Sequence, residues 1–134
     1  MTTALKLLAW YKKHGRDLAW RKTRDPYHIL VSEVMLQQTQ VDRVKYFYSA
    51  WLKQFPDWKR LSMATNEDVV RAWAGLGYNR RALMLRDAAR HVVTHGIPTS
   101  LEGWHAIKGI GPYTAAAISA FAQKKRVMPI DTNI

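Results

Sequence analysis

Two segments with helical character are joined by the stretch IKGIGPYT, residues 107–114. Gly109 and Gly111, separated by one apolar residue, permit a tight hairpin with positive φ angles, and Pro112 suits the first position of the helix that follows. The free backbone N–H groups at the start of that helix would form a site for a phosphate. The stretch therefore favours a helix-hairpin-helix unit that holds a DNA backbone without reading its sequence. A plain turn between two helices would have the same pattern.

Helical periodicity continues along the rest of the chain. Apolar stripes bounded by caps and by glycine or proline predict helices from residue 4 to the break at Gly15, and at 26–39, 41–55, 65–73, 80–95, 101–107 and 112–121. No stretch alternates with period two for long enough to form a strand. We therefore expect an all-α fold in a single helical region spanning residues 1–134, with the hairpin unit at about 101–123.

The 134 residues carry 21 Lys and Arg against 10 Asp and Glu, a formal net charge of +11. This charge is spread along the chain, which suits a folded surface that contacts nucleic acid at several points; a basic surface that only confers solubility is the alternative. The absence of cysteine excludes a disulfide, a thiol nucleophile and a cysteine-held metal. No apolar run reaches the length of about 20 residues that a transmembrane helix needs, and the first residues do not resemble a signal peptide. We expect a cytoplasmic protein with no membrane partner.

The predicted helix at 26–39 carries a single carboxyl group, that of Glu33. Apolar residues surround it on nearly every side, which is typical of a buried helix. A carboxyl group on such a helix has to be paired with a cation, or has to stay neutral because loss of solvation raises its pKa. A carboxylic acid that stays protonated near neutral pH is what a general acid requires. Two interpretations are open: a general acid, or a structural ion pair with an arginine.

Uncharged amides follow directly in the run QQTQ, residues 37–40. Gln37 lies four residues after Glu33 and therefore shares its helix face. Amides at a helix end can hydrogen-bond base edges or enter a duplex as a wedge, although a polar last turn exposed to water would give the same run. Far along the chain, Asp131 follows an apolar segment with no helix left to cap, so we interpret the sequence as a fragment of a longer protein.

Taken in order, these stretches resemble the helix-hairpin-helix DNA glycosylases, and within them the adenine glycosylases that act on A/G mismatches. The resemblance runs from Trp10 to Asn133 and is most specific across residues 25–41, DPYHILVSEVMLQQTQV. Shorter motifs accompany it in the order of the family: WR at 20–21, GLGY at 75–78, GIG at 109–111 and DTN at 131–133. The resemblance implies a six-helix-barrel lobe that ends before the region of the iron–sulfur cluster.

The resemblance also implies a role for each matching residue. Glu33 would protonate N7 of an extruded adenine, and Asp131 would stabilise the cationic sugar, supported by Tyr113 and Asn133. The adenine pocket would be formed by Trp20, Arg21, Leu36 and Val41. The residues that would contact DNA are Gln37, Gln38, Thr39, Leu76, Tyr78, Gly109 and Gly111, of which Gln38 and Tyr78 would enter the duplex beside 8-oxoguanine.

The implied function is base excision repair by a monomeric enzyme, associated with the nucleoid if the source is bacterial. The enzyme would flip adenine mispaired with 8-oxoguanine or guanine out of duplex DNA and hydrolyse its N-glycosidic bond. Tyr113 stands where bifunctional relatives have a lysine nucleophile, which favours a monofunctional glycosylase. The family's 4Fe–4S cluster and its C-terminal 8-oxoguanine-recognition domain lie beyond Asp131. We expect the cluster in a full-length parent, and no metal ligands in this chain.

Three alternatives remain open. A related glycosylase that removes thymine or uracil from mismatches also keeps a tyrosine at the position of Tyr113. A helix-hairpin-helix fragment that binds DNA without chemistry would need the hairpin but neither carboxyl group. A basic helical protein that binds RNA or the ribosome would explain the charge, but it gives Glu33 and the QQTQ run no purpose.

Overall fold

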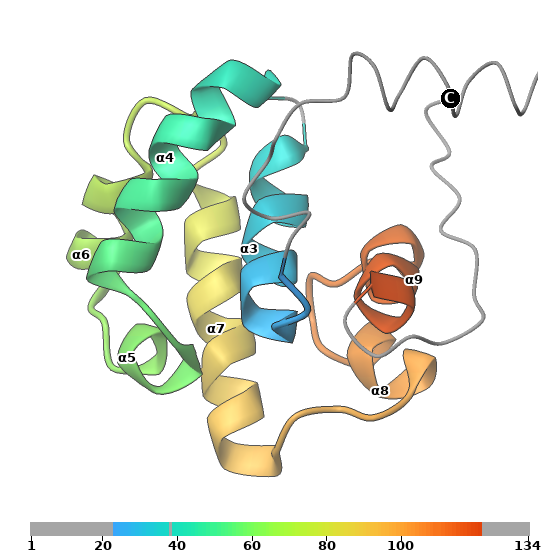
Figure 1. Cartoon of the computed structure of the whole chain (residues 1–134). Helices are drawn as coiled ribbons and strands as arrows, with labels where there is room; N and C mark the ends of the chain where they lie inside the picture. The colour runs from blue at the N-terminus through green and yellow to red at the C-terminus, as the bar shows by residue number, and fades with distance from the viewer. Residues whose placement is uncertain (1–22, 38, 122–134) are drawn as a thin grey trace, which may run out of the picture.

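The structure, a computed structural model, describes residues 23–37 and 39–121, and its regular secondary structure in these ranges is entirely α-helical. The helices are α3 (Pro26–Leu36), α4 (Val41–Gln54), α5 (Trp58–Ser62), α6 (Asn66–Trp73), α7 (Arg80–His95), α8 (Leu101–His105) and α9 (Pro112–Phe121) (Figure 1). The all-α prediction is therefore confirmed. The helix predicted after residue 4 lies outside the described residues, and a single lobe over residues 1–134 stays a prediction. None of the described helices combines the length and apolar composition of a membrane span.

The middle of the described structure is occupied by α3, with α4 and α7 on one side and α9 on the other (Figure 1). Its apolar residues are almost completely buried, among them Leu30, Val31 and Val34. The helix begins as predicted, with Pro26 in its first turn and with the Asp25 carboxylate accepting a hydrogen bond of 2.8 Å from the Tyr27 backbone N–H. The prediction of a buried helix at this place is confirmed.

Local signals also set other helix ends. The Thr65 hydroxyl accepts a 3.1 Å hydrogen bond from the Asp68 backbone N–H, so the predicted cap of α6 is present. Gly96 ends α7 with a φ of 90°, which only glycine adopts without strain. In both cases the partners lie within a few residues of each other, so the sequence contains all the information that the cap requires.

Three features differ from the predictions. α3 ends at Leu36 rather than at residue 39, because Gln37 has an extended backbone and the Arg81 guanidinium takes the carbonyl oxygens of Val34 and Gln37. The short helix α5 was not predicted, since five residues show no apolar stripe. It begins where the Asp57 carboxylate accepts a 2.8 Å hydrogen bond from the Arg60 N–H. The hairpin's first helix, predicted at 101–107, ends at His105.

A buried aromatic cluster joins the start of α3 to the end of α4. The Tyr27 hydroxyl donates a 2.5 Å hydrogen bond to the Phe55 carbonyl oxygen and accepts one of 3.2 Å from Trp51 Nε1. Burial raises the pKa of Tyr27, so the hydroxyl keeps its proton and remains a donor. The Trp51 ring packs edge to face on those of Phe55 and Trp73. This hydroxyl therefore satisfies two buried polar groups at once.

We expect Tyr27→Phe to lower the free energy of unfolding by about 1–3 kcal/mol, because the Phe55 carbonyl and the Trp51 N–H lose their partner inside the core. Urea unfolding followed by circular dichroism measures this loss. Tyr46→Phe is the matched control, because Tyr46 is 73% exposed. A difference between the two variants of less than about 0.5 kcal/mol would contradict the prediction.

Candidate active site

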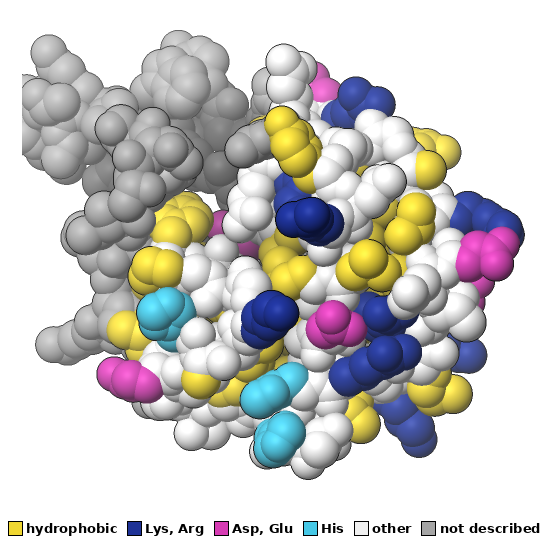
Figure 2. Space-filling model, turned by 180° about the vertical axis from the view of Figure 1, so that it is seen from behind, with side chains coloured by type: hydrophobic (Ala, Val, Ile, Leu, Met, Phe, Trp, Pro, Cys, Tyr) yellow, Lys and Arg dark blue, Asp and Glu magenta, His cyan; other side chains and the backbone are white. Residues whose placement is uncertain are grey.

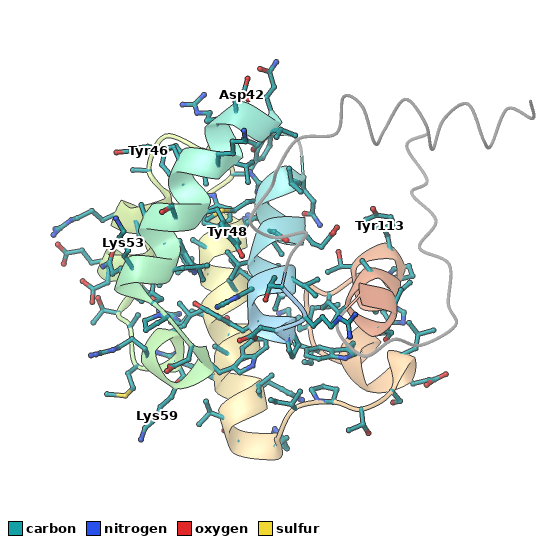
Figure 3. The ribbon with its side chains drawn as sticks, viewed as in Figure 1. Asp42, Tyr46, Tyr48, Lys53, Lys59 and Tyr113 are labelled. Carbon is teal, nitrogen blue, oxygen red and sulfur yellow. The ribbon has the colours of Figure 1, made fainter. Side chains whose placement is uncertain are left out.

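The ends of three helices meet at one edge of the molecule, the upper edge in Figure 1. α3 ends there, while α4 and α7 begin there, and Asp42 in the first turn of α4 marks the edge in Figure 3. The polar run that follows α3 and the glycine turn that precedes α7 are thereby brought together. Helix ends carry backbone groups without intrahelical partners, so this edge offers polar groups to a partner.

The face of α3 that carries Glu33 is directed toward α9. Gln37 lies one turn after Glu33, and its side-chain amide donates a 3.4 Å hydrogen bond to the Thr114 hydroxyl of α9. Tyr113, half-buried, precedes Thr114 and lies on the upper side of α9 in Figure 3. Helical spacing from Gln37 therefore puts Glu33 on the face of α3 toward α9, and Tyr113 lies on the neighbouring upper side of α9.

Glu33 itself is half-buried, although α3 is buried as a whole. The sequence predicts a carboxyl group enclosed by apolar residues on nearly every side. The structure leaves part of this side chain accessible. A general acid needs both properties, since a substrate must reach it and solvent must not surround it.

The hairpin between α8 and α9 has one left-handed glycine. Gly109 has a φ of 92°, as predicted, and the turn closes through a 3.1 Å hydrogen bond from the Ile110 N–H to the Ile107 carbonyl. A positive φ at Gly111 was also predicted and is wrong. Gly111 precedes Pro112, and a proline restricts the residue before it to an extended backbone. A Cβ at Gly111 would meet nothing within 4 Å, so the backbone there is open to close approach.

The turn Gly75–Tyr78 presents an aromatic ring to solvent. Gly75 and Gly77 have φ angles of 100° and 80°, and Tyr78 has a φ of 53° with 67% of its surface exposed. A positive φ is rare for a residue with a large side chain, and such strain is concentrated at functional sites. Leu76 is buried in the core and anchors the turn, so its expected contact with DNA stays a prediction.

The other candidate residues have the following positions. Leu36 and Val41 are half-buried and packed against the core, next to the polar run. Thr39 is half-buried, and its hydroxyl accepts a 3.4 Å hydrogen bond from Arg81 Nη2. The candidates that lie outside the described residues are Trp20, Arg21, Gln38, Asp131 and Asn133. Their proposed roles stay predictions.

Sequence reasoning missed Arg81, which contacts both the polar run and the glycine turn. One signal was present: Arg80 and Arg81 open α7, where the positive end of the helix dipole disfavours a cation. A basic residue in that position indicates a partner elsewhere. The partner is the carbonyl end of α3, whose dipole is negative.

The basic side chains are spread widely over the face shown in Figure 2, with acidic side chains among them, and do not gather in a single patch. Such a distribution attracts a polyanion to this face as a whole. It does not locate a binding site. The helix ends described above are therefore a better guide to the interface than the charge.

The described residues contain no group of three or more His, Cys, Asp or Glu side chains that could hold a metal ion, and the sequence has no cysteine. An iron–sulfur cluster is held by cysteine thiolates. The cluster that the family resemblance implies therefore does not fit the residues of this chain.

Comparison with known proteins agrees with this geometry. Residues 31–134 match the family model of the HhH-GPD superfamily base excision DNA repair proteins. The adenine DNA glycosylase of Mycobacterium tuberculosis is 42% identical over 132 residues, which cover 96% of this chain and 43% of the relative. The chain thus spans less than half the length of this curated relative.

Solved structures share the fold. A thermostable thymine-DNA glycosylase superposes with a TM-score of 0.86 at 28% identity, over 96% of this chain and 61% of the other. Endonuclease III trapped in a covalent intermediate with DNA superposes with a TM-score of 0.78 at 16% identity, over 98% of this chain and 66% of the other. The second likeness concerns the fold alone.

We expect Gly109→Ala to destabilise the hairpin by about 1–3 kcal/mol, because the added methyl group would overlap Met84 of α7 and the residue would keep a positive φ. Gly111→Ala is the matched control and should change the free energy of unfolding by less than about 0.5 kcal/mol, since its new Cβ would have open space. Urea unfolding measures both values. Equal effects of the two substitutions would show that the hairpin does not depend on a left-handed Gly109.

Proposed function

The chain belongs to the HhH-GPD superfamily of base excision DNA repair proteins, and we propose that it is the part of an adenine DNA glycosylase that opens the duplex and supplies the proton. Its substrate is duplex DNA with adenine opposite 8-oxoguanine or guanine. Its reaction is hydrolysis of the bond between C1′ of deoxyribose and N9 of adenine. The adenine specificity is supported by the residues at 25–41 and by the name of the curated relative.

The observation that carries this proposal is the half-buried Glu33 on the seam between α3 and α9, one turn from an amide that is hydrogen-bonded across that seam. Adenine is a poor leaving group as an anion. A neutral Glu33 that protonates N7 lets the base leave uncharged, and the resulting carboxylate then takes a proton from water. The hydroxide equivalent adds to C1′ as the C1′–N9 bond breaks, so atoms and charge balance.

The target bond lies inside the base stack, so the adenine has to be turned out and the gap has to be filled. Tyr78 suits the second task, because its exposed ring stands on a turn held in a strained conformation. Gln37 and Thr39 belong to the same edge, and on our proposal they contact the duplex beside Tyr78. Gln38 belongs to this group on our proposal, although it lies outside the described residues.

The remaining steps are assigned by the family resemblance. Asp131, ionised, offsets the positive charge that develops on the sugar, and Asn133 and Tyr113 support the site. A tyrosine at position 113 forms no Schiff base with the sugar, so the enzyme is monofunctional. The adenine pocket is lined by Trp20, Arg21, Leu36 and Val41.

The enzyme acts as a monomer on chromosomal DNA in the cytoplasm. On our proposal, a 4Fe–4S cluster and a domain that recognises 8-oxoguanine belong to a longer parent protein. The sequence has no cysteine that could hold the cluster. No step of the proposed reaction passes through the cluster.

A second candidate is removal of thymine or uracil opposite guanine. It is supported by the likeness to a thymine-DNA glycosylase at a TM-score of 0.86. The identity to that protein is 28%, against 42% to the adenine DNA glycosylase. Duplexes containing A:8-oxoguanine and T:G pairs, offered to the same preparation, distinguish the two activities by which base is released.

We expect Glu33→Gln to lower the single-turnover rate of adenine release by at least about 100-fold, because an amide has no proton to give to N7. Affinity for an A:8-oxoguanine duplex should stay within about threefold of wild type, since the side chains have nearly the same shape and position 33 adds no phosphate contact. Base release is measured by alkaline strand cleavage, and affinity by fluorescence anisotropy.

Glu102→Gln is the control, because Glu102 is an exposed glutamate on α8 and should leave both quantities unchanged. A wild-type rate in Glu33→Gln would refute the mechanism. If the wild-type chain binds the mismatched duplex but releases no base, a DNA-binding fragment without chemistry is the better description.

A further inference from the structure

Arg81 joins two segments that the proposed function requires to act together. The first is the loop after α3, residues 37 and 39–40, and the second is the turn Gly75–Tyr78. One guanidinium nitrogen of Arg81 donates to the carbonyl oxygens of Val34, at 2.7 Å, and of Gln37. The other donates to the Thr39 hydroxyl and to the Gly77 carbonyl, both at 3.4 Å. A single side chain thus binds both segments through four acceptors.

The same guanidinium lies against the aromatic residues of the turn. Its central carbon is 5.3 Å from the centre of the Trp73 ring and 5.6 Å from that of Tyr78, which is the geometry of a cation–π contact. Trp73 in turn donates a 3.0 Å hydrogen bond to the Gly77 carbonyl. Arg81 therefore contacts the exposed Tyr78 ring on one side and the loop after α3 on the other.

Binding the carbonyl end of α3 stabilises that helix, but it does not by itself explain the contacts of Arg81 with the turn Gly75–Tyr78. Within the part of the chain that the structure describes, Arg81 forms no ion pair with a carboxylate, and its Nε is buried without a hydrogen-bond partner. Burial lowers the pKa of Arg81, because loss of solvation works against the charged form. The residue is therefore better explained by what it positions.

We propose that Arg81 is a positioning residue that keeps the loop after α3 and the turn Gly75–Tyr78 in the one relative arrangement in which both enter a duplex. This inference rests on the proposed function, because it assigns Tyr78 and the loop to the opened base pair. Val34, whose carbonyl Arg81 binds, directly follows Glu33 in the sequence. The side chain therefore also links the acid's helix to the inserted residue.

Hydrogen–deuterium exchange tests the positioning without reference to activity. In Arg81→Met, we expect the amides of residues 39–40 and 75–78 to exchange about 10-fold faster together, while those of the buried part of α3 stay unchanged. Arg81→Lys keeps the charge but reaches fewer acceptors, so it should give a smaller increase in both segments. Arg80→Met is the matched control, because Arg80 is exposed and is the neighbouring residue.

Duplex opening tests the consequence. With 2-aminopurine placed beside an A:8-oxoguanine pair, wild type should raise the fluorescence as the bases unstack, and Arg81→Met should lose most of that rise. The preference for the mismatched over the matched duplex should fall about 10-fold in Arg81→Met and stay unchanged in Arg80→Met. Both variants lose one positive charge, so the salt-dependent part of their affinity for DNA should fall equally.

The possible outcomes separate the two proposals. Faster exchange in neither segment, or in only one, overturns the positioning role. If Arg81→Met speeds exchange in both segments but keeps the preference for the mismatched duplex, Arg81 is not needed for recognition, and the proposed function stands. If wild type shows no preference for the mismatched duplex, the proposed function fails and the inference fails with it. The exchange data then still show whether Arg81 orders residues 39–40 and 75–78.

Discussion

The burial of α3 is the constraint on which the other features depend. This helix contacts α4, α7 and α9, and apolar side chains fill those contacts. A helix enclosed in this way has to satisfy its terminal backbone groups with partners from the protein, because water does not reach them freely. Asp25 does so at the first turn and Arg81 at the last. With both ends held, the position of Glu33 within the fold is also fixed.

The edge where α3 ends offers a partner polar and aromatic groups in addition to charge. The net charge of +11 acts on a polyanion from a distance and over the whole body. The edge adds what charge alone does not provide: an amide, a hydroxyl, an exposed ring and the start of two helices. Attraction and recognition therefore arise from separate parts of the structure. A change to one should leave the other largely intact.

The sequence predicts those parts of the fold whose partners are close along the chain. The caps at Asp25 and Thr65, the glycine that ends α7 and the helical spacing of Glu33 and Gln37 all involve residues at most four apart. The early end of α3 was not predictable in this way, because it depends on Arg81, which is 47 and 44 residues from its carbonyl partners. Bonds from a side chain to a distant backbone leave no pattern in a sequence.

The candidate site was likewise predictable only where the interacting residues are close along the chain. Its composition and the seam toward α9 follow from spacing, but the left-handed angle expected at Gly111 is excluded by the proline that follows it. The partial exposure of Glu33 depends on which helix packs opposite, which only the folded chain determines.

Two energetic costs lie close together: the positive φ of Tyr78 and the partial desolvation of the Arg81 charge. A fold selected only for stability would place glycine where Tyr78 has its positive φ. Arg81 instead contacts both the Tyr78 ring and the loop that follows α3, and the last turn of α3 carries Glu33. Because Arg81 binds both the carbonyl of the residue after Glu33 and the turn that carries Tyr78, a shift of α3 would be transmitted to Tyr78 as well as to the polar loop. The geometry thus couples the group that would donate the proton to the groups that would open the duplex.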